Sequence, residues 1–293
     1  MQTLAALERK IRSADDLLGV VRTMKALAAV NIRQYEKAVQ ALQASADTVE
    51  SALRAVLRRS HARDLPAHRG HRTAAVIFGS DQGMCGPLNE RIVRYALAGL
   101  DAKQIAHHDR RLLAVGVQVA ARLGTAHHPA DHVFPVPGSV AGITELVYDL
   151  LDVLDDWQGR AGIARVMLFH CRLLGSASWE PTAIQLLPFD RAWLDRLAAG
   201  GWSTRQVPLH REPRRELFSA LLHHYLFIAL FRATGESLAS ENASRLSAMQ
   251  VAETHIGERL DELQVAFQQE RQTAVTAELL DIISGFLTLR GEL

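Results

Sequence analysis

A glycine-rich turn is the part of this sequence most like a chemical site. Residues 79–86, GSDQGMCG, follow an apolar run expected to be a strand and precede a segment expected to be a helix. Nucleotide phosphates bind at such turns, where backbone N–H groups point at the ligand. The glycines are nevertheless spaced G-x-x-x-G-x-x-G, and no GK[ST] supplies a phosphate-binding lysine. We expect a tight strand-to-helix turn and keep nucleotide binding as an alternative.

Histidines and cysteines are the other side chains able to bind metals or react. The thirteen histidines include three adjacent pairs: His107/His108, His127/His128 and His223/His224. Neighbours on a helix or strand point in different directions, and Pro129 spoils the helical spacing of His128 and His132. Cys85 and Cys171 lack CxxC or Cys/His spacing, which indicates a reducing compartment. Without GxSxG or HExxH motifs either, we predict no metal, no cofactor and no catalytic residue.

Proline and glycine divide the chain into three parts. All nine prolines lie between Pro66 and Pro213, and fourteen of the nineteen glycines fall in the same segment. Because proline interrupts helices, both ends of the chain are free to form long helices. We expect a coiled-coil helix at 1–60, a Rossmann-like α/β domain at 61–212 and a second coiled-coil helix at 213–293.

Apolar or small residues recur at steps of three or four along the N-terminal segment. They predict a coiled-coil seam of about seven heptads. The seam comprises Leu4, Leu7, Ile11, Ala14, Leu18, Val21, Met24, Ala28, Ile32, Tyr35, Val39, Leu42, Ala46, Val49, Leu53 and Val56. At about 1.5 Å per residue, this helix would be on the order of 80 Å long and would project beyond a globular domain.

The C-terminal segment has a similar apolar stripe with one polar interruption, SENASR at 240–245. Polar groups there disfavour a fully packed zipper. Residues 1–60 carry ten Lys/Arg against six Asp/Glu, and residues 214–293 carry seven against eleven, which gives charges of +4 and −4. Matched seams and opposite charges predict that the two helices lie against each other; solvated charged faces are the alternative.

The middle segment alternates strand-like and helix-like runs. Strands are expected at 73–79, 111–116, 131–136 (an edge strand), 163–170 and 182–187, and helices at 87–100, 117–123, 140–156 and 190–199. Strands separated by helices predict a mainly parallel, Rossmann-like sheet. The expected fold class is therefore α/β with a long coiled coil.

Charge and hydropathy argue against two classes of function. The formal net charge is +1, so the surface has no overall basic excess that would attract nucleic acid. The longest apolar stretch, 217–231, is interrupted by His223 and His224 and is shorter than the roughly 18–20 residues that cross a bilayer. The first residues show no apolar signal core. We expect a soluble, non-exported chain whose membrane contact comes only through partners.

Four motifs, in order along the chain, carry a family resemblance. Residues 11–39 contain the run TMKALAA at 23–29, and residues 76–89 end a strand with Ser-Asp-Gln-Gly-Met-Cys-Gly. Residues 236–252 contain Ser-Glu-x-x-Ser-Arg-x-x-Ala-Met, and residues 271–285 read RQTAVTAELLDIISG. Together they resemble the gamma subunits of F-type ATP synthases over essentially the whole chain.

The resemblance implies two antiparallel terminal helices that form a rotor shaft, with the Rossmann-like domain packed on its side. It implies a non-catalytic central-stalk subunit that transmits torque between a membrane ring and a catalytic hexamer and regulates its ATPase activity. The implied partners are the alpha and beta subunits, the epsilon subunit and the c-ring. One shaft would contact three chemically identical beta subunits differently, so its rotation would bias the open and closed states of each beta subunit in turn. The implied location is peripheral, on the cytoplasmic face of a bacterial inner membrane.

The resemblance also implies contact residues, because some positions match those that the family uses for hydrogen bonds to beta-subunit loops. These positions are Arg245, Gln272, Thr276 and Glu278. Polar side chains suit contacts that break and re-form each time the shaft rotates. Weaker matches make Met24, Lys25 and Arg33 further interface candidates.

Several positions depart from the family pattern. Gln82 stands where the family usually has Arg, Gln250 where it often has Lys, and Val30 and Asn31 replace a Ser-Lys pair. Residues 268–270 replace a commonly Tyr/Asn/Lys-rich stretch. The loss of basic positions points to a divergent or accessory type of rotary ATPase, and the sequence leaves open whether the coupling ion is a proton or sodium.

Two other functions stay open. The chain could be a Rossmann-like nucleotide-binding enzyme with helical arms, which would need the 79–86 turn to hold phosphate. It could also be a coiled-coil scaffold that bridges unrelated partners.

Overall fold

The chain forms two compact units, each described by itself. The computed structural model describes residues 3–57, 70–175, 178–189, 191–199 and 213–290. Residues 28–245 form the larger unit, and residues 1–27 with 246–293 form the smaller one. Two helices, α1 (Leu4–Ala41) and α7 (Arg214–Arg290), contribute to both units. The units therefore follow contacts rather than sequence order, and the division at residues 60 and 212 stays a prediction.

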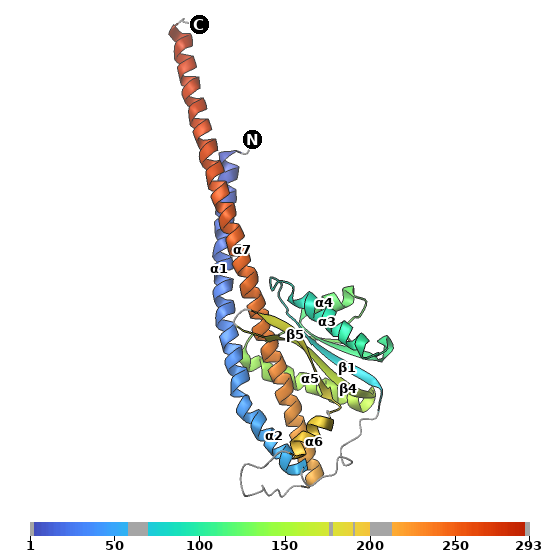
Figure 1. The fold of residues 1–293 in the computed structure, drawn as a ribbon. Helices are drawn as coiled ribbons and strands as arrows, with labels where there is room; N and C mark the ends of the chain where they lie inside the picture. The colour runs from blue at the N-terminus through green and yellow to red at the C-terminus, as the bar shows by residue number, and fades with distance from the viewer. Residues whose placement is uncertain (1–2, 58–69, 176–177, 190, 200–212, 291–293) are drawn as a thin grey trace. The chain divides into compact units, whose positions relative to one another are not determined.

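A five-stranded sheet in the order β3-β2-β1-β4-β5 forms the centre of the larger unit (Figure 1). The strands are β1 (Arg72–Phe78), β2 (Arg110–Val115), β3 (His132–Phe134), β4 (Ile163–Leu173) and β5 (Trp179–Leu187). β1 pairs in parallel with β2 and β4, β2 pairs in parallel with β3, and only β5 runs antiparallel. The predicted mainly parallel sheet and its edge strand near 131–136 are confirmed.

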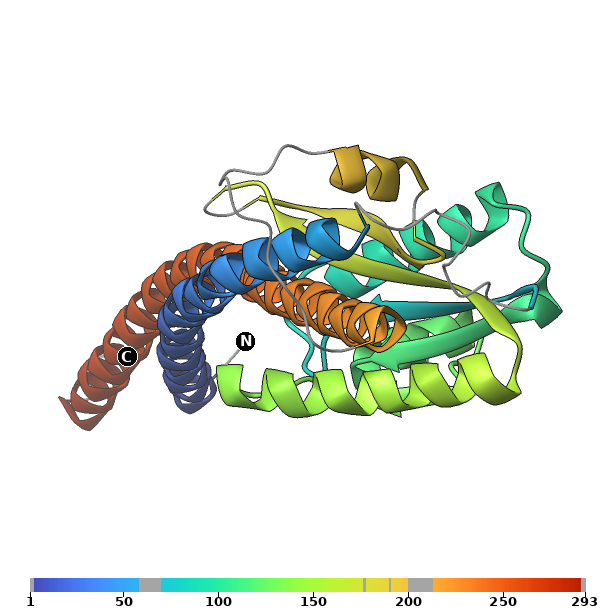
Figure 2. The ribbon, with the colours of Figure 1, turned by 90° about the horizontal axis from the view of Figure 1, so that it is seen from below.

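Helices cover both faces of this sheet. They are α3 (Leu88–Ala102), α4 (Val117–Thr125) and α5 (Val140–Arg160), and a short helix, α6 (Arg191–Ala199), follows β5. Helices α3 and α4 pack on one face, while α5 and part of α7 pack on the other (Figure 2). The predicted helices at 87–100, 117–123, 140–156 and 190–199 are confirmed within a few residues.

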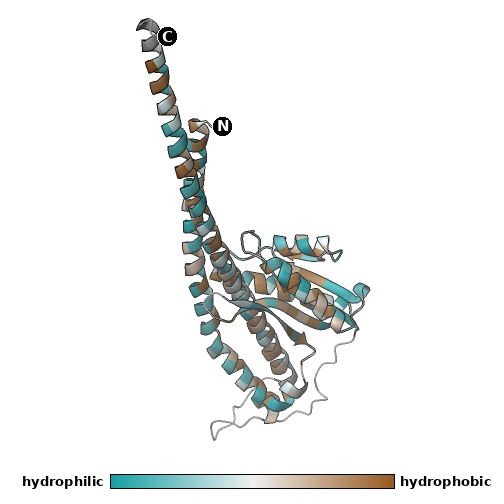
Figure 3. Cartoon of the chain, turned by 45° about the horizontal axis from the view of Figure 1, so that its top comes forward, coloured by the Kyte–Doolittle hydropathy of each residue, from teal (hydrophilic) through white to brown (hydrophobic). Residues whose placement is uncertain are grey.

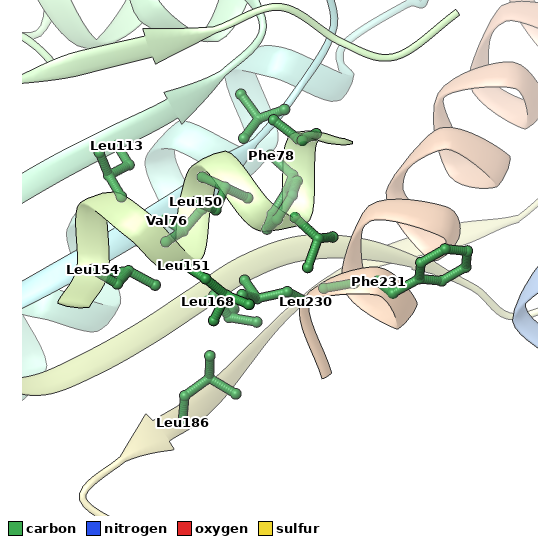
Figure 4. Packing of buried hydrophobic residues seen from close by; sticks show 14 of the residues in the cluster. Val76, Phe78, Leu113, Leu150, Leu151, Leu154, Leu168, Leu186, Leu230 and Phe231 are labelled. Atoms are coloured by element: carbon green, nitrogen blue, oxygen red, sulfur yellow. The ribbon is translucent and has the colours of Figure 1, made fainter. Parts of the chain in front are cut away.

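Alternation along the strands supplies a core on each face. Figure 4 shows Val76 of β1 and Leu168 of β4 facing Leu150 of α5 and Leu230 of α7. Successive strand side chains point to opposite faces, so Phe169 belongs instead to the core under α3 and α4. The same helix α7 that forms the coiled coil thus also closes the core of the α/β domain.

The predicted single N-terminal helix is interrupted. Helix α1 ends at Ala41, Leu42 forms a turn, and α2 (Gln43–Leu57) continues. Helix α2 packs with α6 and the beginning of α7 in a separate apolar cluster. Its buried members are Leu53, Val56, Leu57, Leu194, Leu197, Phe218 and Leu222. Periodicity alone predicted one continuous helix, because the apolar residues keep the same helical spacing in α1, before the turn, and in α2, after it.

In both units α1 and α7 pair as antiparallel helices. In the larger unit Asn31 contacts Asn242, whereas Gln43, later in the chain, contacts Arg232, earlier in α7. In the smaller unit Arg22 donates a hydrogen bond to Glu253. Seam residues on both helices are buried: Leu7, Leu18, Val21, Ala28, Ile32 and Tyr35 on α1, and Met249, Leu260 and Leu263 on α7. The predicted seam and the pairing of the terminal helices are confirmed.

Within the described residues one helix, α7, includes an 18-residue window that passes a length-and-composition test for crossing a membrane. Core helices of soluble proteins pass the same test. Phe218, Leu222, Leu230 and Phe231 of α7 are buried within the larger unit. Packing inside the protein therefore accounts for the apolar side chains of α7 between residues 218 and 231.

Candidate functional site

The 79–86 turn is closed by side chains of the protein itself. The Ser80 N–H donates to Asn89 Oδ1 at 3.0 Å, and Asn89 Nδ2 donates back to Ser80 Oγ at 2.8 Å. A Cβ at Gly79 would lie 2.6 Å from Asn89 Oδ1 and 2.6 Å from Val119 Cβ. Glycine is therefore needed for close packing, and the Ser80 N–H of the turn is already bonded to an amide side chain.

Asp81 gives the same turn a negative charge and a structural task. Its carboxylate accepts hydrogen bonds from the backbone N–H groups of Val117, at 2.9 Å, and Val136, at 2.8 Å. These bonds tie the ends of three strands together. A carboxylate at this place opposes the binding of a second anion. The geometry of residues 79–86 supports the expected tight turn. The bonded Ser80 N–H and the Asp81 carboxylate both argue against a phosphate site there.

The cysteines and histidines are placed for packing. Cys85 and Cys171 are free and buried, and burial raises the pKa of the Cys171 thiol to about 12, so it is inert at neutral pH. The rings of His107 and His128 stack with centroids 4.4 Å apart, and burial lowers the pKa of His128. Among the described residues, no group of three or more His, Cys, Asp or Glu side chains could hold a metal ion.

The polar interruption of α7 is buried in the chain itself. Ser240, Asn242 and Ser244 are at most 5% exposed. Ser244 Oγ donates to the carbonyl oxygen of Cys85 at 2.6 Å, and Asn242 Oδ1 accepts from Asn31 Nδ2 at 3.4 Å. This segment therefore holds the 79–86 turn and α1 against α7. The sequence showed that a simple zipper fails here, but the structure shows what replaces it.

Arg245, a predicted contact residue, forms a buried ion pair with Glu241. Its Nη2 lies 2.6 Å from Glu241 Oε1, and the two side chains are 10% and 8% exposed. Burial raises the pKa of the Glu241 carboxyl, and Arg245 opposes that rise. Among the described residues, Glu241 Oε2 and Arg245 Nε have no hydrogen-bond partner. Glu241 belongs to the 236–252 motif but was not predicted as a site residue.

A second buried polar pair links α7 to the sheet and was also missed. Val166, Leu168 and His170 form one row of β4 side chains toward α7, and His170 is fully buried. Its Nε2 lies 2.9 Å from Glu236 Oε2, while its Nδ1 has no hydrogen-bond partner in the described ranges. A histidine inside an apolar strand was the available sequence signal. The pairing with Glu236 needed the tertiary structure, because 66 residues separate the two.

The other predicted contacts on α7 lie on its exposed C-terminal part. Gln272 and Thr276, one helical turn apart, share a face, and Thr276 Oγ1 bonds the Gln272 carbonyl at 2.8 Å. Glu278 is exposed on another face. Large apolar side chains stand around them with 48–68% exposure: Val275, Leu279, Leu280, Ile282 and Ile283. Figure 3 shows hydrophobic and hydrophilic residues interspersed along this part of α7.

The predicted contacts on α1 differ in their surroundings. Met24 is half-buried, and Lys25 forms an ion pair with Glu253 that Arg22 joins at 3.0 Å. The hydrogen bond from Lys25, followed by that from Arg22, lowers the pKa of the Glu253 carboxyl. Arg33 is exposed. The structure thus brings Met24 and Lys25 into the coiled coil and leaves Arg33 on the surface.

Comparison with known proteins shows the family. A family model described as ATP synthase matches residues 3–289. This chain belongs to the ATP synthase family. An ATP synthase gamma chain from Polaromonas sp. is 25% identical, with 94% of this chain and 96% of the relative covered. The gamma chain of Anaeromyxobacter dehalogenans is 27% identical, with 97% and 99% covered.

Solved structures of the family show the same fold. A chain in the cryo-EM structure of the Euglena gracilis mitochondrial ATP synthase, OSCP/F1/c-ring, matches with a TM-score of 0.67 at 16% identity. It covers 98% of this chain and 95% of its own length. A chain from the central stalk and c-ring of the Tetrahymena thermophila mitochondrial ATP synthase has a TM-score of 0.56 at 20% identity, with 80% and 99% covered.

Proposed function

We propose that this chain is the central-stalk rotor subunit of a proton- or sodium-translocating F-type ATP synthase. It transmits torque between a membrane ring and a catalytic hexamer and regulates the ATPase activity of that hexamer. The observation that carries the proposal is the family match over residues 3–289. The antiparallel pairing of α1 and α7 in each unit supports it, since a shaft must resist twisting as it turns.

The proposed partners are the alpha and beta subunits of the hexamer, the epsilon subunit and the c-ring. The similar structures are assemblies that contain F1, the c-ring or the central stalk, which supports this set. The exposed apolar residues at 275–283 of α7 supply surface for such a partner, because exposed apolar area gains from being buried. The similar gamma chains of Polaromonas sp. and Anaeromyxobacter dehalogenans come from bacteria, which supports a peripheral place on the cytoplasmic face of the inner membrane.

The chain itself is proposed to be non-catalytic. The turn most like a phosphate site is filled by Asn89 and bears the Asp81 carboxylate. The contacts with beta-subunit loops are proposed for Gln272, Thr276 and Glu278, which are exposed, and for Met24, Lys25, Arg33 and Arg245. Exposed polar side chains can form and break hydrogen bonds with little reorganisation.

The test is to co-express the chain with the alpha and beta subunits encoded beside it and to measure ATP hydrolysis by the purified assembly. Turnover is expected to require the chain. Gln272→Ala should lower turnover, whereas Gln250→Ala, an exposed amide elsewhere on α7, serves as the matched control. Folded alpha and beta subunits that hydrolyse ATP equally well with and without the chain would refute the proposal.

The two alternatives predict other outcomes. A nucleotide-binding enzyme predicts that millimolar ATP or NAD raises the melting temperature of the isolated chain. A scaffold for unrelated partners predicts no assembly with alpha and beta subunits at all.

A further inference from the structure

The Glu241–Arg245 pair is unusual because it is buried yet only partly satisfied. Both residues lie on α7, one helical turn apart, and their single hydrogen bond joins Arg245 Nη2 to Glu241 Oε1. A guanidinium has five N–H donors and a carboxylate two acceptor oxygens. Within the part of the chain that the structure describes, the buried Arg245 Nε and Glu241 Oε2 have no hydrogen-bond partner. One donor of Arg245 and one acceptor of Glu241 thus stay unused, whereas an ion pair with a purely structural role would be expected to use both.

The surroundings of Glu241 make its carboxylate dependent on Arg245. Burial, and after it the charge of Asp81 on the 79–86 turn, raises the pKa of Glu241. Burial, and after it the charge of Glu241, raises the pKa of the Tyr35 phenol on α1. Arg245 is the cation that opposes the rise in the pKa of Glu241. If the guanidinium moves away, Glu241 is left buried beside another acid. Binding a proton is then the least costly response, because the neutral form tolerates burial.

We propose that Glu241 is an internal counter-ion that competes with a carboxylate of the catalytic ring for Arg245. When the chain is alone, the guanidinium of Arg245 forms its ion pair with Glu241. When an acidic side chain of a ring subunit approaches, Arg245 leaves Glu241 and pairs with the carboxylate of the ring. Once the shaft has rotated away, Arg245 pairs with Glu241 again. Glu241 is thus a positioning residue that limits how tightly the ring is held. The inference rests on the proposed function and adds a residue that sets the strength of one contact.

A double-mutant cycle on ATP turnover of the assembled complex tests the competition. Glu241→Gln keeps the size of the side chain and removes the competing charge, so Arg245 should hold the ring longer and turnover should fall. Coupled residues in one network predict a change on the order of threefold or more. In the Arg245→Ala background the same substitution should have no effect. Glu262→Gln, an exposed carboxylate on α7 that pairs with Arg259, is the matched control and should leave turnover unchanged.

The pH profile separates competition from a merely structural role. Protonation of Glu241 removes its charge, as Gln does, so the turnover of the wild type should approach that of Glu241→Gln as the pH falls. Asp81 and Tyr35 also face Glu241 and are coupled to its charge, so Asp81→Asn and Tyr35→Phe, each combined with Glu241→Gln, show what these two groups contribute to the profile. Melting curves of the isolated variants establish whether each is folded before assembly.

Three results would overturn the inference. Equal effects of Glu241→Gln in the wild type and in the Arg245→Ala variant would show that it acts independently of Arg245. A silent Glu241→Gln in a complex that depends on the chain would remove Glu241 while leaving the rotor proposal in place. Turnover that does not depend on the chain would overturn the proposed function itself, and the inference with it.

Discussion

The buried His170–Glu236 pair predicts a measurable asymmetry between its two members. His170 is fully buried, whereas the Glu236 side chain is 22% exposed. Glu236→Ala removes the one hydrogen-bond partner that the imidazole has among the described residues, where its Nδ1 has none. Leaving a buried polar group without a hydrogen bond costs about 1–3 kcal/mol of unfolding free energy. The reverse deletion is milder, because Glu236 can reach water.

The magnitude follows from the site of the pair. Val166 and Leu168, the neighbours of His170 in its row on β4, are both buried against the same core. His170→Leu therefore extends an apolar row and should recover most of the loss when combined with Glu236→Ala, since replacing both polar partners with apolar groups is nearly neutral. The double variant is expected to be more stable than the single Glu236→Ala variant.

Urea unfolding of the isolated chain, followed by tryptophan fluorescence, measures these differences. Trp157, which packs in the same core, and Trp179 on β5 report on the α/β domain. A loss of 1 kcal/mol lowers the melting temperature of a domain of this size by about 2–4 °C. Glu180→Ala, which breaks the exposed ion pair between Arg172 and Glu180, is the matched control and should change nothing measurable.

Two outcomes would refute this reasoning. If Glu236→Ala is no more destabilising than Glu180→Ala, His170 gains nothing from its partner. If the double variant is less stable than Glu236→Ala alone, the imidazole is retained for its packing shape rather than its hydrogen bond.

Three further predictions concern other parts of the chain. Gly79→Ala should destabilise by about 1–3 kcal/mol in urea, because its Cβ would meet two side chains at 2.6 Å, whereas Gly124→Ala has open space and should not destabilise. Burial lowers the pKa of His128, so the unfolded chain binds a proton that the folded chain rejects; stability should fall as the pH drops below the ordinary value of 6.5, and His128→Gln should flatten that decline in denaturant titrations. Leu280→Glu and Ile283→Glu change exposed positions, so melting of the isolated chain should be unaffected, while ATP turnover of the complex should fall.

Local pattern was sufficient for most of the secondary structure. The apolar spacing of α1 and α7, the absence of proline from both ends, and the apolar runs of β1 and β4 each depend on a few neighbouring residues. The geometry of helices and strands sets the spacing of the residues on one face, whatever the position of the segment in the fold. The same reasoning predicted the mainly parallel sheet, since strands separated by helices must cross over to pair. The family resemblance likewise came from motifs that can be read in order along the chain.

Contacts between distant residues were decided only by the tertiary structure. The sequence showed polar groups at 240–245 and assigned Arg245 to a partner protein, but it could not show that Glu241 already pairs with this arginine in a buried place. Nor could it join His170 to Glu236 or fill the 79–86 turn with Asn89. Whether a polar side chain is exposed, satisfied or unpartnered depends on what packs over it, and that is set by the whole fold rather than by its neighbours in sequence.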